Sequence, residues 1–288
     1  MSSKDSEIIR LEKIANDLKV KIIRMIAKSG IGHAGGSMSI AEIVAVLYFH
    51  VMRVNPENAL DENRDRFILS KGHASATQYA ALARWGIIPE DELWTLHHID
   101  SRLQMHPERG LCPGIEMSTG ALGQGLSAGI GMAIGANLKK KDFRCYVVLG
   151  DGELMEGQVW EAAMSAPKFK LDNLTAIVDY NKFSLTSRTK ETMPLDPLGD
   201  KWKAFGWQVI EVDGHSVSQL VQAFDEAKTV KGKPTVIIAH TFKGHDIPAL
   251  EDTAASHSVS FTKEQVEATL NHLGCSIDEI NQTLSIMK

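Results

Sequence analysis

The sequence predicts an α/β fold in which a parallel central sheet is flanked by helices. The second half of the chain contains four short apolar runs rich in Val and Ile, which is typical of strands buried on both faces of a sheet. Helical segments separate these runs, and strands that alternate with helices form a parallel sheet. The chain has 288 residues, of which 43% are hydrophobic, so it can bury a sizeable core.

The first half of the chain is predicted to be mainly helical. Apolar residues recur at helical spacing over 6–28, and Gly30 ends this helix. A second helix is expected to begin at Ser39, because Ser39 and Glu42 have the spacing of a capping box. The remaining elements are a candidate strand at 66–70, helices over 76–85 and 90–98, and a glycine-rich stretch at 110–125 that opens a helix near 123–138.

The second half of the chain supplies most of the predicted sheet. The apolar runs lie at 145–150, 174–180, 207–214 and 234–241, with helical stretches at 153–168, 196–206 and 216–230. An irregular loop over 243–260 and a helical tail over 262–287 follow. Because no repeat or linker interrupts the chain, we expect one domain over residues 1–288 with its core at about 10–260.

Composition excludes several classes of protein. The net charge of −5 gives no general attraction to nucleic acid or to an anionic membrane. No apolar run approaches the roughly 18 residues that a membrane-spanning helix needs. The start, MSSKDSEIIR, has no apolar signal region, and the three cysteines (Cys112, Cys145 and Cys275) form no CxxC pair. We therefore expect a cytoplasmic protein with reduced thiols.

Polar side chains follow two of the predicted strands at the point where each ends. Asp151 lies between Gly150 and Gly152, and Asn181 comes 30 positions later, after the next apolar run. If the two strands are neighbours, Asp151 and Asn181 converge on the crevice at the carboxyl ends of the sheet. Carboxylate and amide oxygens suit Mg²⁺ or Ca²⁺, a backbone carbonyl just past Asn181 can add a third oxygen, and the glycines let the backbone approach a diphosphate. A GDG tripeptide alone is a common turn, so the strand context and the asparagine carry the prediction of a metal–diphosphate site.

Several longer motifs extend this interpretation. GDGELMEG followed by YNKF resembles the thiamine diphosphate motif, and five other segments are similar to transketolases: SGIGHAGGSMSIAE (29–42), LSKGHAS (69–75), MHPE (105–108), STGALGQG (118–125) and TFKGHDIPALEDTAASH (241–257). They stand in the family's order and span roughly residues 10–260. The resemblance covers only the amino-terminal, diphosphate-binding part of a transketolase, so the chain resembles the first subunit of a split transketolase.

The resemblance implies roles for particular residues. Asp151, Asn181 and the Phe183 carbonyl would bind Mg²⁺, with Ca²⁺ or Mn²⁺ as substitutes. The cofactor-binding set would be His73, Gly120, Ala121, Leu122, Asp151, Gly152, Asn181, Lys243 and His257. The catalytic set would be His33, His73, His106 and His257, which in the family line the channel to the thiazolium ring, hydrogen-bond the sugar hydroxyls and help to move protons. Lys71 is a further candidate contact or a solvated lysine, and Glu156 either joins an acidic network at the subunit interface or is a solvated helix residue.

The resemblance also implies an activity and a partner. A transketolase moves a two-carbon ketol unit from a ketose, usually phosphorylated, to an aldose. In the family the cofactor binds between the diphosphate domain of one protomer and the pyrimidine domain of another. We therefore expect activity only with a second chain that carries the pyrimidine-binding and third domains, in an assembly of two plus two. The glutamate of that chain and its sugar-phosphate arginines have no counterpart here, and the sugar itself (pentose phosphate, apulose phosphate or a sulfosugar) stays open.

Alternatives remain at this point. The alpha subunit of a 2-oxo acid dehydrogenase and a deoxyxylulose-phosphate synthase share the GDG–Asn device, and a non-catalytic binding protein could keep the same fold. The segment from Gly30 to Gly35 fits G-x-G-x-x-G, but it follows a predicted helix rather than a strand, which argues against dinucleotide binding. Two positions depart from the family: Ser258 stands where a glycine is common, and Gly36 where some members have a serine that touches the cofactor.

Overall fold

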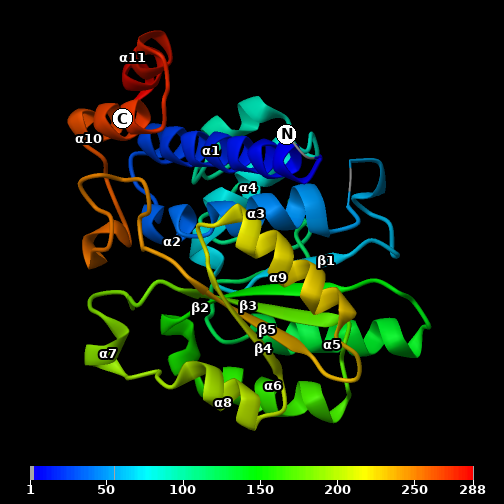
Figure 1. Cartoon of the computed structure of the whole chain (residues 1–288). Coiled ribbons are helices and arrows are strands. Elements are labelled where there is room, and N and C mark those ends of the chain that lie inside the picture. Colours follow the sequence, from blue (N-terminus) through cyan, green and yellow to red (C-terminus); the bar gives the residue numbers. More distant parts are fainter. Residues whose placement is uncertain (1–2, 55, 288) are drawn as a thin grey trace.

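A five-stranded parallel sheet forms the centre of the protein (Figure 1). The computed structural model describes residues 3–54 and 56–287. The strands are β1 (Arg66–Leu69), β2 (Cys145–Gly150), β3 (Leu174–Tyr180), β4 (Gln208–Asp213) and β5 (Thr235–His240). Their order across the sheet is β1-β2-β3-β5-β4, and every neighbouring pair is parallel. The predicted α/β fold is confirmed, and the candidate strand at 66–70 is an edge strand of the sheet.

The central strands are apolar because both faces of the sheet are covered. Every residue of β2 and β3 is buried. Successive side chains point to opposite faces, so Val147 joins the core on one side of the sheet and Val148 the core on the other. The edge strand β4 is only partly buried, in agreement with its more polar sequence.

Two layers of helices sandwich the sheet (Figure 1). One layer contains α1 (Ser3–Ser29), α2 (Ala34–Met38), α3 (Ala41–Val46), α4 (Ser75–Arg84) and α9 (Val217–Thr229), with a π-helical turn at Leu47–Val51. The other contains α5 (Gly125–Leu138), α6 (Gly157–Lys168) and α8 (Leu198–Ala204), and α7 (Thr189–Thr192) lies at its margin. The tail forms α10 (Lys263–His272) and α11 (Ile277–Ile286), which pack against α1. Single 3-10 turns are Pro56–Asn58, Gly72–Ala74, Glu90–Thr95, Gly152–Met155 and Ala254–Ser256.

Some predicted elements need correction. The capping box at Ser39 is wrong: α3 begins at Ala41, and the Ser39 hydroxyl donates to the buried Asp179 carboxylate at 2.8 Å. The helix predicted at 90–98 is only the 3-10 turn Glu90–Thr95, and the helix predicted over 153–168 begins with the turn Gly152–Met155 before α6. The tail is two helices rather than one, because Gly274 adopts a φ of 80° and turns the chain.

Two further expectations concern the whole chain. Over the described residues, no helix has both the length and the apolar character needed to cross a membrane. The three cysteines are free thiols, two of them buried.

Candidate active site

The two predicted metal ligands lie side by side at the carboxyl edge of the sheet. Strands β2 and β3 are neighbours, and Gly150 is in register with Asp179, so Asp151 and Asn181 follow directly after paired strand ends. A cavity of about 370 Å³ opens there, a size typical of small-molecule sites. Its lining includes every predicted site residue except Ala121, whose side chain is exposed, and it also includes Lys71 and Glu156.

The metal-binding candidates present oxygen atoms to this cavity. The Asp151 carboxylate is 1% exposed and accepts hydrogen bonds from the backbone N–H groups of Gly152 and Lys182. The Asn181 amide donates to Asp179 at 2.6 Å and its oxygen accepts from Phe183 N at 3.1 Å. Burial, reinforced by the nearby Asp179 carboxylate, raises the pKa of Asp151 to about 8. A buried carboxyl of this kind fits a divalent cation, which would stabilise its ionised form.

Glycine allows the two ligand-bearing turns to meet. A Cβ on Gly152 would lie 3.2 Å from Ser184 Cα and 3.5 Å from the Phe183 carbonyl oxygen. The turn that carries Asp151 therefore packs directly against the segment that carries Asn181 and Phe183. Any larger residue at position 152 would push the two segments apart.

A buried ion pair forms the floor of the site. Lys71 Nζ lies 2.5 Å from Asp179 Oδ2, and the two residues are 1% and 0% exposed. Burial alone would raise the pKa of Asp179, but the Lys71 ammonium and several hydrogen bonds lower it, so the carboxylate stays ionised. Lys71 also donates to the Gly36 carbonyl at 2.7 Å. Lys71 is thus neither solvated nor free, because it neutralises an acid that supports Asn181.

Glu153 holds three cavity-forming loops together. Its carboxylate accepts hydrogen bonds from Gly123 N at 2.9 Å, from Gly150 N at 3.0 Å and from the Ser70 hydroxyl. The side chain is 2% exposed, and burial raises its pKa. The segments after β1 and β2 are therefore tied to the glycine-rich entry of α5.

Four histidines from four separate segments meet around the cavity. The ring centroid of His33 lies 5.3 Å from that of His73, 5.2 Å from that of His257 and 6.3 Å from that of His106. Burial lowers the pKa of all four, to about 4 for His33 and about 3 for His257. At neutral pH each ring is therefore uncharged and can either donate or accept a proton. His33 Nδ1 is buried without a hydrogen-bond partner among the described residues, which fits a polar ligand in the cavity.

Lys243 connects the histidines to the segment that follows Asn181. Its ammonium donates to the Ser184 carbonyl at 2.7 Å and lies 3.0 Å from His257 Nδ1. Burial, with a smaller contribution from Lys71, lowers the pKa of Lys243 to about 8. The side chain is 3% exposed and lines the cavity, so a positive charge is available to an anionic ligand.

The positions of two further glycines bear on the predicted cofactor contacts. Gly120 has a φ of 134°, and a Cβ there would lie 2.8 Å from the His106 ring, so only glycine fits. At Gly36 a Cβ would lie 3.3 Å from His73 Nε2 and 3.5 Å from Lys71 Nζ. A side chain at position 36 would therefore press against the His73 ring and the Lys71 ammonium.

Sequence reasoning missed two residues of this site. Asp179 interrupts the apolar run LTAIVDY with an acid, and Glu153 follows directly after GDG. An acid inside a strand that is otherwise apolar is a readable signal, because a buried charge must be paired. No comparable signal marks Glu153, because two of its three partners, Ser70 and Gly123, lie far from it along the chain.

A larger groove of about 840 Å³ lies elsewhere and contains none of the predicted site residues. Three of its four arginines are already paired with acids: Arg64 and Arg66 with Glu116, and Arg102 with Glu92. The smaller cavity therefore remains the better candidate for chemistry.

Comparisons with known proteins decide the family. Residues 11–284 match the family described as "Transketolase, thiamine diphosphate binding domain". The chain belongs to this family. The expected resemblance is therefore confirmed, and thiamine diphosphate is the cofactor of the domain that the chain represents.

Similar proteins include chains that are named as transketolase subunits. The 6-deoxy-6-sulfo-D-fructose transketolase subunit SqwG of Clostridium sp. (strain MSTE9) is 43% identical over 265 residues, which cover 92% of this chain and 96% of that protein. An apulose-4-phosphate transketolase subunit of Phocaeicola vulgatus is 37% identical over 276 residues, 96% of this chain and 98% of that protein. The chain is thus a transketolase-type transferase subunit that corresponds to the amino-terminal chain of a split transketolase.

Full-length transketolases match over less than half of their length. Human transketolase is 41% identical over 276 residues, which cover 96% of this chain and 44% of that protein. Among solved structures, transketolase from Leishmania mexicana has a TM-score of 0.85 at 32% identity, and the enzyme from Campylobacter jejuni has 0.87 at 29%. These alignments cover 96% of this chain and 44% and 46% of those chains.

Proposed function

We propose that the chain is the Mg²⁺- and thiamine diphosphate-binding subunit of a transketolase and that it works as one domain. The meeting of Asp151 and Asn181 with four histidines in one cavity is the observation that carries this proposal. Asp151, Asn181 and the Phe183 carbonyl would hold the metal, and Lys243 would offset the charge of the diphosphate. Gly152 and Gly120 let the backbone come close to the cofactor.

When bound, the cofactor supplies carbanion chemistry at its thiazolium ring, and the protein supplies position and electrostatics. The role of this chain rests on neutral imidazoles. His33 and His257 are uncharged at neutral pH because burial lowers their pKa, so each can take a proton from a sugar hydroxyl or return it. His106 lies closer to solvent, where it would contact the far end of the donor sugar.

The proposed reaction transfers a two-carbon ketol unit from a ketose, free or phosphorylated, to an aldose. Relatives of similar length are named for a sulfo-sugar and for apulose 4-phosphate, so chains of this kind serve transketolases of different substrate. The deoxyxylulose-phosphate synthase and 2-oxo acid dehydrogenase alternatives gain no support from the names of these relatives. The substrate class proposed here is therefore a ketose donor with an aldose acceptor.

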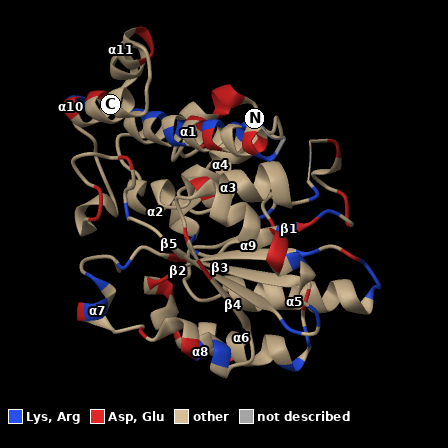
Figure 2. Ribbon diagram, viewed as in Figure 1, with Lys and Arg blue, Asp and Glu red and all other residues tan. Residues whose placement is uncertain are grey.

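A second subunit is part of the proposal, and α5, which is drawn without charged positions in Figure 2, supports it. Helix α5 has no charged residue, yet its stripe of Ala128, Gly131, Met132 and Gly135 is not fully covered by this chain. A Cβ on Gly131 or Gly135 would meet nothing within 4 Å among the described residues, so packing within the chain does not explain either glycine. An uncovered apolar helix face marks a protein interface. We assign this stripe, the α5 face, to the subunit with the pyrimidine-binding domain, in an assembly of two plus two.

The metal assignment is tested with matched variants of buried aspartates. Asp151→Asn is expected to abolish Mg²⁺-dependent binding of thiamine diphosphate in calorimetry, because a carboxylate ligand is lost. Asp65→Asn is the control: Asp65 is also buried and also accepts two backbone hydrogen bonds, from Arg53 and Arg144, but it lies at the start of β1 on the opposite edge of the sheet. Unchanged cofactor affinity in Asp151→Asn would refute the metal assignment.

The requirement for a second subunit is tested by mixing the two purified chains. The chain alone is expected to show no transketolase turnover, and a partner chain with the pyrimidine-binding domain is expected to restore it. Turnover by the purified single chain would contradict the two-subunit proposal.

A further inference from the structure

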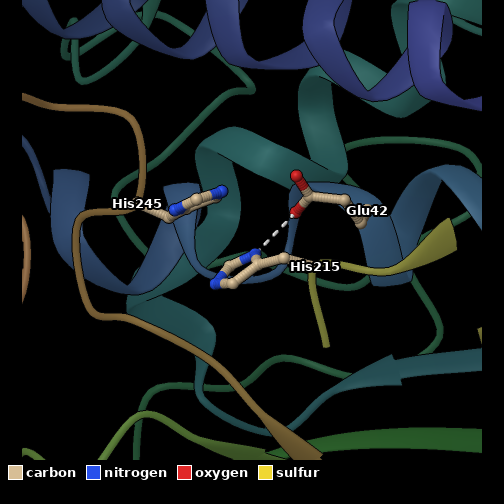
Figure 3. Close-up of side chains that lie close together, drawn as sticks. All are labelled: Glu42, His215 and His245. Carbon is tan, nitrogen blue, oxygen red and sulfur yellow. Dashed lines mark hydrogen bonds and ion pairs between the residues drawn. The ribbon is translucent and has the colours of Figure 1, made fainter. Parts of the chain in front are cut away.

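A second cluster of titratable side chains lies behind the active-site cavity. Glu42 on α3, His215 after β4 and His245 after β5 approach one another closely, and their possible ligand atoms lie within 4.8 Å (Figure 3). The rings of His215 and His245 are stacked with centroids 3.6 Å apart. A carboxylate and two imidazoles at this spacing resemble a site for a divalent metal.

The hydrogen bonds argue against a metal in this cluster. The Lys19 ammonium already contacts Glu42 Oε1, and it lies 2.5 Å from Asp246 Oδ2. His215 Nε2 accepts the backbone N–H of Phe242 at 2.9 Å, so the ring proton must be on Nδ1, which donates to Glu42 Oε2 at 3.2 Å. Both nitrogens of His215 are therefore engaged, and neither has a lone pair left for a cation.

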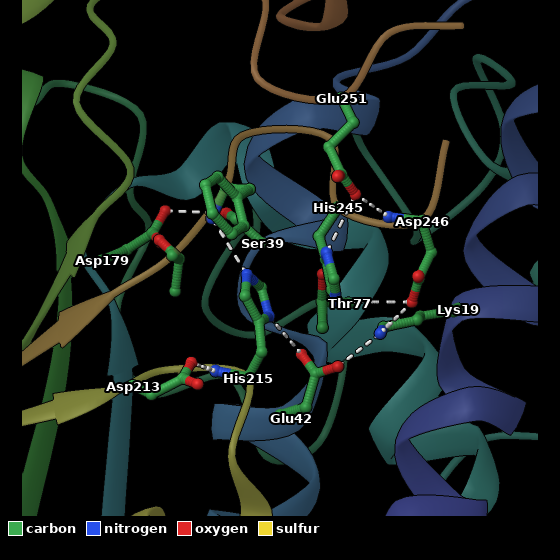
Figure 4. A network of polar contacts seen from close by, with 12 residues as sticks. Lys19, Ser39, Glu42, Thr77, Asp179, Asp213, His215, His245, Asp246 and Glu251 are labelled. Atoms are coloured by element: carbon green, nitrogen blue, oxygen red, sulfur yellow. Dashed lines mark hydrogen bonds and ion pairs between the residues drawn. The ribbon is translucent and has the colours of Figure 1, made fainter. Parts of the chain in front are cut away.

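The cluster contacts both ends of one short loop, which runs from Phe242 to Asp246. Phe242 and Asp246 flank Lys243, the lysine that lines the cavity and contacts His257. Glu42 holds the first end through His215 and the second end through Lys19 (Figure 4). One carboxylate thus anchors the Lys243 loop from behind at two points.

The rest of the loop is consistent with a rigid support. The Lys243 carbonyl accepts from Asp252 N at 2.8 Å. Gly244 N donates at 3.0 Å to the carbonyl of Gly35, which lies two residues after His33 in the chain. Other charged or titratable groups that face the network are Asp213, which accepts the His215 backbone N–H at 2.9 Å, and His245, Glu251 and His272, which contact Asp246 or one another. Burial alone would raise the pKa of Glu42, which is 5% exposed, but His215 and Lys19 lower it and keep the carboxylate ionised.

We propose that Glu42 is a positioning residue for the reaction, acting with His215 and Lys19. It touches no atom of the cavity; it fixes the tautomer of His215 and the backbone of Phe242, and so it fixes where Lys243 and His257 point. This inference rests on the proposed function of the cavity. The geometry of the anchor itself can be measured on the isolated chain.

The first test is spectroscopic and needs no cofactor. In chain labelled with ¹⁵N-histidine, NMR correlations across the ring are expected to show His215 as the Nδ1–H tautomer, and added Zn²⁺ is expected to leave its signals in place. An Nε2–H tautomer, or Zn²⁺-dependent shifts of both His215 and His245, would overturn the proposal in favour of a metal site.

The second test uses Glu42→Gln. The amide oxygen can still face Lys19, but its NH₂ group then opposes the Nδ1–H of His215, so the ring is expected to lose its tautomer preference. Hydrogen exchange at Phe242 N should accelerate about tenfold or more, because its acceptor is lost, while the amides of β2 and β3 keep their protection. An equal rate of hydrogen exchange at Phe242 N in wild type and Glu42→Gln would contradict the proposal.

The matched control is Glu211→Gln. Glu211 also pairs with a histidine, His240 Nε2 at 3.1 Å, but this pair is exposed and does not touch the loop. With the partner subunit present, Glu42→Gln is expected to lower kcat about tenfold or more and Glu211→Gln to leave it unchanged. An assembled wild-type enzyme without any transketolase activity would refute the proposed function alone, because the tautomer and exchange results would still decide the anchor. If Glu42→Gln does not fold, the His215 tautomer measured in the wild-type chain still tests the proposal.

Discussion

Leucine at Gly131 and Gly135 should strengthen the isolated chain and weaken its assembly. Both glycines lie on the α5 face, where an added Cβ meets nothing within 4 Å among the described residues. Glycine in a helix interior is about 1 kcal/mol less favourable than alanine or leucine, so the double variant should gain about 2 kcal/mol in free energy of unfolding. The same side chains would overpack a partner helix at about 1–3 kcal/mol each, which raises the Kd for the partner about 5- to 150-fold per position.

The test needs two measurements, in which the stability of the isolated chain is expected to rise and its affinity for the partner to fall. Denaturant unfolding of the isolated chain measures the gain in stability, and titration with the partner subunit measures the loss in affinity. Gly129→Ala is the control on the inner face of the same helix, where a Cβ would lie 2.5 Å from Val147 Cγ2. It should destabilise the chain by about 1–3 kcal/mol through strain against the sheet. A leucine variant that binds the partner with unchanged affinity would refute the assignment of the α5 face.

Two predictions concern the buried charges. Lys71→Met should cost about 3–5 kcal/mol in unfolding free energy because Asp179 is left as an unpaired buried carboxylate, and Lys71→Met/Asp179→Asn should recover much of that loss; a single variant as stable as wild type would contradict the role of the pair. Lowering the pH from 6.5 toward 4 should destabilise the fold through His33 and His257, because the unfolded chain binds protons near pH 6.5 while burial lowers the folded pKa values to about 4 and about 3. Asp151, with its pKa raised to about 8, has the opposite effect on stability over this pH range. The test therefore compares the thermal unfolding of wild type and His33→Asn/His257→Asn as a function of pH. Equal dependence of stability on pH in the two proteins would contradict the role of the histidines.

The sheet and the meeting of Asp151 with Asn181 could be predicted because their signals are local. Short runs rich in Val and Ile such as CYVVLG and LTAIVDY are typical of buried strands, and a polar residue directly after such a strand lies at the edge where the strands end. The pairing of β2 with β3 then brings Asp151 beside Asn181 without any further information. The resemblance to transketolases supplied what local signals lack, which is the meeting of His33, His73 and His257 from distant segments.

The predicted capping box failed because distant parts of the chain compete for its polar groups. Ser39 and Glu42 have the spacing of a capping box, but each finds a better-buried partner. The Ser39 hydroxyl goes to Asp179, 140 residues away, and the Glu42 carboxylate goes to Lys19 and His215. Inside a protein such charge-assisted hydrogen bonds are stronger than a cap on a helix end, so a local motif cannot decide the outcome.

The exposed side chains of this chain connect the cavity with the proposed subunit interface. The buried charges of the site are paired within this chain, Asp179 with Lys71 and Glu42 with Lys19 and His215. The rim of the cavity is formed by exposed side chains, among them Leu185, which is 61% exposed, and Glu156. Ala121, the one predicted cofactor residue that this chain leaves in solvent, lies just ahead of α5 and its uncovered face. A subunit that covers the α5 face would therefore also cover this rim and exclude water from the histidines, and cofactor affinity should rise on assembly in wild type but less in the leucine variant.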